Sequence, residues 1–339
     1  MNARERVAAA LRCEQPDRVP YCELGIDRAL AQKLMGWGPG ISQAANLEAN
    51  IYSVEEARAL AAHLELDNIG YVLRAPVYAE KLPGLDGRLF YGKGLIPSRR
   101  ELHRLQLPDP NDDALYADAA RFLAGRGDYS TWFITRMGIF PTMLSMGTEA
   151  FSIALYEDRG LVEEILDRYV DWSVAVARRA CAMGFDVYVT TDDMAFKTGP
   201  FFSPKVFREL VMPRYRRLRE AVTLPWVIHS DGNMMPFLDD LVSLGIAGFH
   251  PNEKGAMDIR EVKRRYGGRL CVLGNVDLNI LGMGTPDDVD REVYELIHAV
   301  GPGGGYIVTS GNSLAGYVRP ENAVALGRAV RKYGAYPLT

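Results

Sequence analysis

Short β-rich segments alternate with helical segments along almost the whole chain, and this alternation constrains the fold more than any other feature. Each β-rich segment is a run of apolar or β-branched residues bounded by polar or turn residues. The predicted strands cover residues 18–24, 68–73, 131–136, 186–191, 225–230, 246–250, 270–274 and 305–310. Such alternation predicts a parallel sheet. Eight strands in 339 residues favour one closed (β/α)8 TIM barrel over residues 1–339, with a doubly wound open sheet as the alternative.

Helices are predicted between these strands from apolar periodicity and from signals at their ends. Ser53 and Glu56 have the spacing of a capping box, which predicts a helix over residues 53–65. Pro204 after Ser203 predicts a helix that runs to about residue 221. Further helices are expected at the N-terminus and at 159–183, 234–244, 258–266, 285–299 and 320–333. The Pro/Gly-rich stretch 74–112 is expected to leave the barrel and border its mouth.

Composition and charge exclude several classes of function. The formal net charge is −4, so the chain has no basic excess with which to neutralise nucleic-acid phosphates. No apolar run reaches the ~18 residues of a membrane-spanning helix. Four cysteines are scattered without a C-x-x-C pair, which argues against a disulfide framework and for a reducing, cytoplasmic location. No G-x-G-x-x-G follows the first strand, which argues against dinucleotide binding.

Polar residues gather where the predicted strands end. In (β/α)8 barrels the active site lies at these carboxyl ends. Burying such groups costs several kcal/mol unless they are paired or bind a ligand, so we expect an active site at this rim. The candidate substrate-binding residues are Glu23, Tyr71, Arg136, His250, Asn252, Asn275, Asp277, Ser310 and Asn312.

The candidate catalytic residues are His229, Asp193 and Asp192. The two adjacent carboxylates either cap a helix or pair with Lys197, or else they bind a cation or hold a proton. His229, at a strand end, is either a structural histidine or a ligand or acid–base group. A metal site can be assembled from four residues, because two or three N/O ligands and a water make an open catalytic zinc site. These residues are His229, Asp193, Glu209 and Asp231.

Several segments together resemble the uroporphyrinogen decarboxylase superfamily. They are Pro16–Pro20, Asp192–Met194, Gly199–Pro204, His229–Asn233, Gly274–Asp277 and Pro320–Asn322, and the similarity spans residues 3–333. The resemblance implies a (β/α)8 barrel, often dimeric, with its site in the barrel mouth. It also implies one of two chemistries. One is decarboxylation of uroporphyrinogen without a cofactor, and the other is methyl exchange with a corrinoid protein, commonly with zinc.

Departures from the family pattern narrow this choice. The decarboxylases carry an arginine-rich segment after the first strand, where residues 21–28 offer only Arg28. The thiol-activating methyltransferases carry His-x-Cys at the His229 segment and a second cysteine after the last strand. This chain has Asp231 and Ser310 there. A carboxylate and histidine site suits an oxygen ligand better than a thiol, which points to the demethylating members.

Three hypotheses follow. In the first, zinc assists a methyltransferase that moves a methyl group from a small methoxylated or methylated substrate to cob(I)alamin on a separate corrinoid protein. In the second, a cofactor-free decarboxylase or lyase acts on a smaller acid, with Arg136 holding the carboxylate and Asp192 or Asp193 stabilising a protonated intermediate. The third is a non-catalytic partner of a methyltransferase complex, against which the costly polar rim argues.

Overall fold

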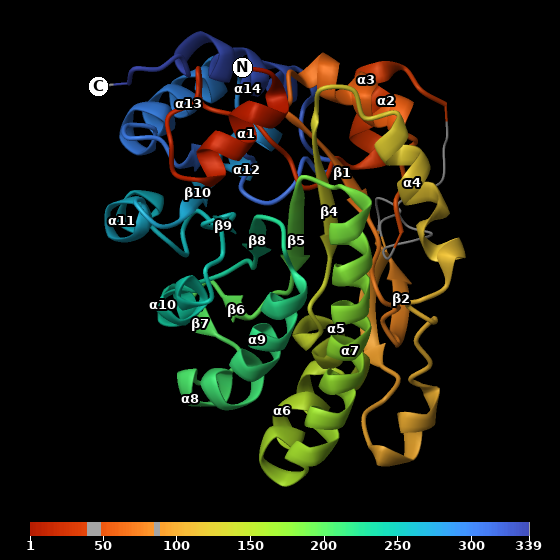
Figure 1. The fold of residues 1–339 in the computed structure, drawn as a ribbon. Helices are drawn as coiled ribbons and strands as arrows, with labels where there is room; N and C mark the ends of the chain where they lie inside the picture. Colours follow the sequence, from red (N-terminus) through yellow and green to blue (C-terminus); the bar gives the residue numbers. More distant parts are fainter. Residues whose placement is uncertain (39–48, 85–88, 339) are drawn as a thin grey trace.

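A seven-stranded parallel sheet forms the centre of the molecule (Figure 1). The computed structural model describes residues 1–38, 49–84 and 89–338. The spatial order is β1-β4-β5-β8-β9-β10-β11, and every neighbouring pair is parallel. The strands are β1 (Asn68–Val72), β4 (Ser130–Thr135), β5 (Val187–Thr191), β8 (Trp226–His229), β9 (Gly248–His250), β10 (Cys271–Leu273) and β11 (Tyr306–Ile307). The sheet is curled in the manner of a TIM barrel, which confirms the predicted fold class.

The first predicted strand, residues 18–24, is not one of these seven strands. It is an extended segment that lies between β11 and β1 and closes the curled sheet through isolated bridges. Tyr21 pairs in parallel with Val308, beside β11. On its other side, the Asn68 side chain accepts from the Glu23 N–H at 3.0 Å and donates to the Glu23 carbonyl at 2.9 Å. Together with the hydrogen bond from the Asp67 N–H to the Tyr21 carbonyl, this amide side chain joins the segment to the start of β1.

Helices lie outside the sheet and mostly follow the predicted ranges (Figure 1). The Ser53–Glu56 capping box is present at the start of α3. The helix predicted for 203–221 is interrupted by a wide π-helical turn at Phe207–Val211. The helices are α2 (Arg28–Met35), α3 (Val54–Leu64), α4 (Ala117–Ala124), α5 (Ile139–Met146), α6 (Thr148–Glu157), α7 (Arg159–Met183), α8 (Pro204–Val206), α9 (Met212–Ala221), α10 (Met235–Ser243), α11 (Ile259–Tyr266), α12 (Leu278–Met283), α13 (Pro286–Val300) and α14 (Pro320–Tyr333).

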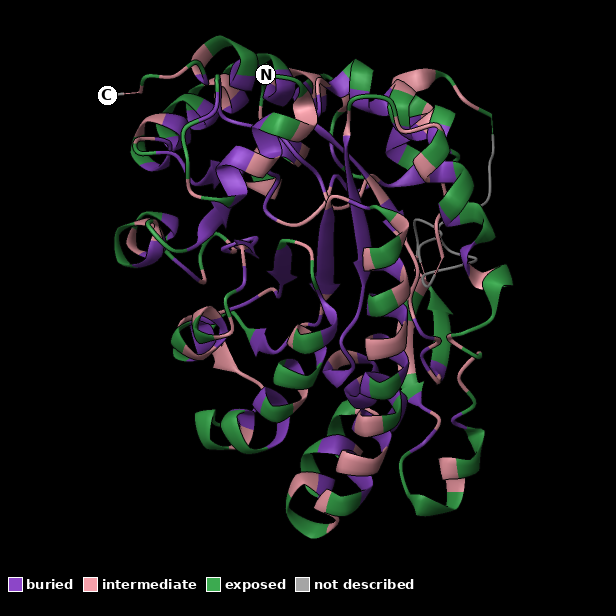
Figure 2. Cartoon of the chain, in the orientation of Figure 1, coloured by how far each residue is buried: buried purple, intermediate pink, exposed green. Residues whose placement is uncertain are grey.

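The sheet separates two buried layers, because successive residues of a strand point to opposite faces. Figure 2 shows the strands as the buried centre of the molecule. The inner layer includes Trp132, Val189 and Leu273, and it packs against α1 (Ala3–Leu11). Arg6 on α1 binds Asp67, the residue just before β1, at 2.7 Å. Helix α1 thus closes the amino-terminal end of the barrel and leaves the carboxyl ends of the strands open for a site.

The predicted excursion at 74–112 is a hairpin with a following 3-10 helix. Strands β2 (Ala79–Pro83) and β3 (Leu89–Gly94) pair antiparallel, and the 3-10 helix spans Arg99–Arg104. Tyr91 on β3 lies against Arg136 at the end of β4, so the hairpin borders the barrel mouth as expected. A second short hairpin, β6 (Ala195–Phe196) with β7 (Gly199–Pro200), follows β5. Among the described residues, no helix is long and apolar enough to cross a bilayer.

Candidate functional site

Three side chains from two neighbouring strand ends meet at the barrel mouth. Asp193 follows β5, His229 ends β8, and Asp231 lies two residues further on. The His229 Nε2 atom is 3.7 Å from an Asp193 oxygen and 3.8 Å from Asp231 Oδ1. One ligand atom from each residue lies within 4.8 Å of the others. The structure therefore brings together three of the four predicted metal ligands.

Local contacts hold Asp231 in this cluster. Its backbone N–H donates to Asp193 Oδ1 at 3.0 Å, and Asn312 donates to its Oδ2 at 2.5 Å. Gly232 turns the chain with a φ of +83°, where a Cβ would lie 2.4 Å from the carbonyl oxygen of Ala195. The second carboxylate oxygen, Asp231 Oδ1, is buried and has no hydrogen-bond partner among the residues that the structure describes. A buried acceptor without a donor is costly, so this oxygen marks a place for a ligand.

The electrostatics of the cluster also favour a cation. Burial, and after it the negative charges of Asp193 and Glu253, raise the pKa of Asp231 to about 8. Burial lowers the pKa of His229, which keeps its imidazole neutral and able to act as a ligand. One imidazole nitrogen and two carboxylate oxygens fit zinc or a similar divalent cation with a further position open to substrate.

His250 lies behind His229 rather than at the substrate. The two Nδ1 atoms are 2.7 Å apart, and His250 is fully buried. Metal-ligating histidines usually donate their other ring N–H to an acceptor that fixes the tautomer. Here the His250 Nδ1 atom can be that acceptor, so His250 orients His229 instead of binding substrate as predicted.

The prediction of Glu209 as a metal ligand is wrong. Glu209 lies in the π-helical turn, and its side chain is 43% exposed. It accepts a hydrogen bond from Arg159 at 2.9 Å and lies 3.9 Å from Lys205. The helix that follows β5 packs on the outside of the sheet, and this face of it carries surface ion pairs away from the mouth.

Asp192 has a structural role in the fold, and its catalytic role stays a prediction. Its carboxylate is fully buried and accepts hydrogen bonds from the backbone N–H groups of Met137, Gly138 and Phe140. Met137 and Gly138 belong to the connection between β4 and α5, and Phe140 lies in the first turn of α5, so Asp192 caps that helix from the neighbouring strand. Adjacent residues of an extended chain point to opposite sides, which separates Asp192 from Asp193.

Tyr71 is not at the mouth, which corrects its predicted role in substrate binding. It lies on the outer face of β1, in the layer between sheet and helices. Its ring centroid is 5.4 Å from that of Phe122, 6.2 Å from Phe133 and 6.1 Å from Phe185. Sequence reasoning missed Arg74, which follows β1 and does line the mouth. The predicted strand 68–73 already ends next to Arg74, so the rule that sites lie at strand ends identifies Arg74 rather than Tyr71.

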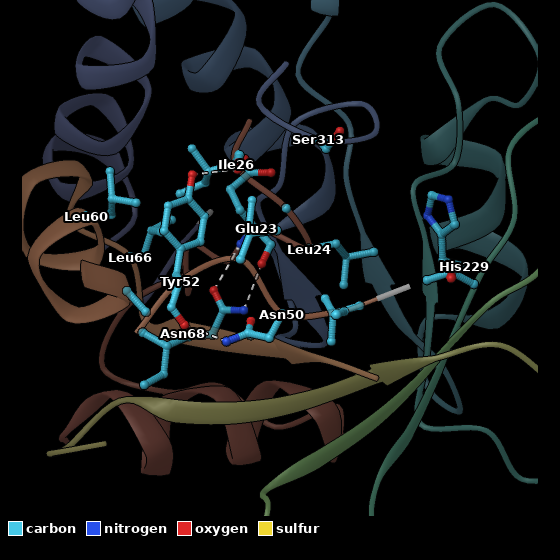
Figure 3. Close-up of a pocket in the computed structure, with 18 of the residues that line it drawn as sticks. Glu23, Leu24, Ile26, Asn50, Tyr52, Leu60, Leu66, Asn68, His229 and Ser313 are labelled. Carbon is cyan, nitrogen blue, oxygen red and sulfur yellow. Dashed lines mark hydrogen bonds between the residues drawn. The ribbon is translucent and has the colours of Figure 1, made fainter. Parts of the chain in front are cut away.

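A cavity of about 280 Å³ adjoins the cluster (Figure 3). It lies between the segment after Cys22, the start of α3 and β1, and it reaches His229. Apolar lining comes from residues such as Leu24, Leu60 and Ile69. Polar lining comes from Glu23, Asn50, Asn68, Arg74, Thr191, His229 and Asn312. Two of the predicted substrate-binding residues, Glu23 and Asn312, therefore line this cavity.

Glu23 is a buried carboxyl group in the cavity wall. It accepts hydrogen bonds from the Ser310 backbone N–H at 2.8 Å and from the Ser310 hydroxyl at 2.6 Å. Burial outweighs these hydrogen bonds and raises the pKa of Glu23 to about 8. Near neutral pH Glu23 is therefore mostly protonated, and Ser310 holds it in place.

The remaining predicted substrate-binding residues at β9 and β10 connect strand ends. Asn252 donates to the carbonyl oxygens of Phe249 and Leu273, and Asn275 donates to that of Asn252 at 2.5 Å. Asp277 caps α12. None of Asn252, Asn275 and Asp277 is among the described residues that line the cavity. Their hydrogen bonds connect the strand ends at the rim, and their contact with substrate stays a prediction.

Comparisons with known proteins agree on one superfamily. The family model described as uroporphyrinogen decarboxylase matches residues 92–333. Uroporphyrinogen decarboxylase from Alkalilimnicola ehrlichii is 23% identical over 267 residues, covering 74% of this chain and 72% of that protein. The enzyme of the same name from Shewanella halifaxensis is 22% identical over 253 residues, covering 69% of this chain and 68% of that protein.

Solved structures extend the comparison to methyltransferases. A methyltransferase from Methanosarcina mazei superposes with a TM-score of 0.80 at 20% identity, covering 98% of this chain and 99% of that one. A B12-independent methionine synthase from Shewanella sp. W3-18-1 superposes with a TM-score of 0.53 at 10% identity, covering 93% of this chain and 98% of that one. At these identities the likeness establishes the fold.

Proposed function

Because the chain belongs to the uroporphyrinogen decarboxylase family, we propose that its mouth is the site of a metal-assisted methyltransferase of that superfamily. The substrate is a small methoxylated or otherwise methylated compound. The methyl acceptor is cob(I)alamin carried by a separate corrinoid protein. The observation that carries the proposal is the His229–Asp193–Asp231 cluster with its unpartnered Asp231 oxygen.

The ligand chemistry of this cluster selects the kind of methyl donor. Nitrogen and carboxylate oxygen are harder ligands than thiolate, and they suit a cation that acts on oxygen. An alkoxide or phenolate is a poor leaving group, so demethylation of an ether needs help at the ether oxygen. A divalent cation such as zinc, when bound, supplies Lewis acidity at that oxygen.

The chain's own residues prepare the site for this chemistry. His229 Nε2, one Asp193 oxygen and Asp231 Oδ1 would hold the cation. Asn312 keeps Asp231 in place through its hydrogen bond to Oδ2. The apolar wall around Leu24 and Ile69 keeps water from the donor and leaves space for a methyl-bearing group.

Metal analysis tests this proposal first. Protein purified without chelator and digested for mass spectrometry should hold about one zinc per chain, as an open catalytic site does. His229→Ala and Asp231→Asn should lose the zinc. Glu209→Gln is the matched control, because this carboxylate lies on the surface with Arg159, and it should keep the zinc.

Turnover is the second test. Under anaerobic conditions, free cob(I)alamin and a panel of methoxylated compounds should yield methylcobalamin, followed by its absorption spectrum, only with zinc-loaded protein. Absence of zinc even after it is supplied rejects the metal-assisted mechanism. Zinc binding without any methyl transfer, to free or protein-bound cob(I)alamin, rejects the methyltransferase.

The alternative within the family is a cofactor-free decarboxylase that acts on a small acid. Two arginines at the mouth, Arg74 and Arg136, favour it, because a decarboxylase must hold a carboxylate substrate. This alternative predicts release of carbon dioxide from such an acid by metal-free protein. Loss of that activity with Arg136→Gln and its survival in His229→Ala would support decarboxylation over methyl transfer.

A further inference from the structure

Arg136 is a buried cation that forms no ion pair with the described residues. It directly follows β4 and is 7% exposed, and its Nε atom has no hydrogen-bond partner among the residues that the structure describes. Its Nη1 atom donates to the Tyr91 hydroxyl at 3.4 Å. No carboxylate among the described residues lies within ion-pair distance of it. Its guanidinium lies 5.7 Å from the ring centroid of Tyr91 and 5.4 Å from that of Phe140. Flanking rings compensate only part of the cost of removing a charge from water.

Asp192 does not neutralise this charge. Its negative charge acts on Arg136 from the neighbouring strand, but its oxygens accept three backbone N–H groups in and just before the first turn of α5. Those hydrogen bonds hold the carboxylate in a cap and keep it out of contact with the guanidinium. Arg136 therefore retains donors that a fold alone has no reason to bury.

Arg74 brings a second guanidinium to the same side of the mouth. Val72 pairs with Ile134 in the parallel β1–β4 ladder, and Arg74 and Arg136 each follow two residues later, so they lie at neighbouring strand ends. Burial, and after it the positive charge of Arg136, lower the pKa of Arg74 to about 9. Arg74 lines the cavity together with Thr191, His229 and Asn312. Arg74 and His229 therefore line the same cavity, and Arg136, which is not among its lining residues, lies beside it at the neighbouring strand end.

We propose that the substrate is a small methylated carboxylic acid whose carboxylate binds between Arg74 and Arg136 while its methyl-bearing group reaches His229. This inference rests on the proposed function and specifies its substrate class. Planar guanidinium groups bind carboxylates through paired hydrogen bonds, and Arg136 keeps an Nε donor without a partner among the described residues. A cavity of about 280 Å³ is at the small end of ligand sites, so the acid is far smaller than a tetrapyrrole.

Calorimetric titration with acid and amide pairs tests the proposal without turnover. The probes are para-methoxybenzoate with para-methoxybenzamide, and methoxyacetate with methoxyacetamide, each titrated into zinc-loaded protein. At least one acid should bind about tenfold or more tightly than its amide, since only the acid carries the charge. Arg136→Gln and Arg74→Gln should each remove most of this preference, and Arg136→Lys should keep part of it because it keeps the charge.

The control and the remaining measurements separate binding from folding. Arg121→Gln changes an exposed arginine that pairs with Asp118 on α4, and it should keep the full preference. Thermal unfolding and zinc content are recorded for every variant, and Arg136→Lys carries the test if Arg136→Gln does not fold. Equal binding of acid and amide, no binding of either acid, or an unchanged preference in the arginine variants overturns the proposal.

The outcome is distinguishable from that of the proposed function. Acid preference that depends on Arg136, without methyl transfer, rejects the methyltransferase and supports the anion site. Methyl transfer from the neutral amides, at rates that the arginine variants leave unchanged, supports the methyltransferase and overturns the anion site.

Discussion

The Nδ1 atoms of His229 and His250 lie 2.7 Å apart, so one ring must donate a hydrogen bond to the other. Burial lowers the pKa of both residues, and both imidazoles are therefore neutral with one proton each. If His229 keeps its proton on Nδ1, its Nε2 lone pair faces Asp193 and Asp231. Metal binding at Nε2 thus requires His250 to be the acceptor, with its own proton on Nε2.

Replacing His250 by Phe should weaken zinc binding by roughly 10–100-fold, the usual effect of losing such a supporting group. The ring volume is kept, but His229 loses the acceptor that selects its tautomer. Competition with a chromophoric zinc chelator measures the affinity. His250→Asn offers an acceptor oxygen and should recover part of the loss.

The control for this prediction is His103→Phe, because His103 is exposed on the 3-10 helix after the β2–β3 hairpin. It should bind zinc as the wild type does. If His250→Phe binds zinc as tightly as His103→Phe, then His250 does not set the state of His229.

Asp192→Asn should lower stability far more than Asp193→Asn. Asp192 accepts three backbone N–H groups while fully buried, and an amide presents a donor to at least one of them. Hydrogen bonds to a charged group are worth about 1.5–3 kcal/mol each, so a loss of about 2–4 kcal/mol is expected. Urea unfolding of both metal-free variants measures the difference. Equal stabilities would contradict the structural role of Asp192.

The positions of the site residues were predictable where they depended only on strand order. Asp193, His229 and Asp231 follow strands β5 and β8, which are neighbours in the sheet. Parallel neighbours present their carboxyl ends at one edge, so alternation along the chain is enough to bring these residues together. Helix α7 spans residues 159–183, as predicted from its apolar periodicity.

The wrong predictions concern the direction in which a side chain points from a correctly predicted strand or helix. The predicted strand 68–73 agrees with β1 to one residue, but β1 carries apolar residues on both faces, so its pattern does not reveal that Tyr71 points to the outer layer. The π-helical turn at Phe207–Val211, which the pattern does not reveal, sets the face on which Glu209 lies. The hydrogen bonding of the Asn68 amide to the Glu23 backbone depends on tertiary contact alone.

Tyr71→Phe should leave zinc affinity and acid binding within about twofold of the wild type, because the residue packs among aromatic rings outside the barrel. Tyr71→Ala should cost about 3–5 kcal/mol of stability, as a large buried ring leaves a cavity. Denaturant unfolding and the calorimetric titration measure the two effects. Loss of acid binding in a stably folded Tyr71→Phe would mean that the hydroxyl does contact substrate.

The buried carboxyl of Glu23 predicts a pH dependence of stability. Its pKa is raised from 4.5 to about 8 in the folded protein, so the folded state binds one more proton than the unfolded state between these values. The stabilisation is fully present below about pH 4.5, and it is lost as the pH rises through 8, by at most ~1.4 kcal/mol per pH unit.

The Glu23→Gln side chain has the same shape as glutamate but does not ionise. The difference in stability between wild type and variant therefore reports the ionisation of Glu23 alone. Urea unfolding of both metal-free proteins at pH 5, 6, 7 and 8 should show the wild type losing stability relative to the variant across the series. The amide can still accept from the Ser310 backbone N–H, as the carboxyl does now. Parallel stability curves for the two proteins would mean that Glu23 is ionised in the fold at neutral pH, and that the cavity wall carries a negative charge opposite the arginines.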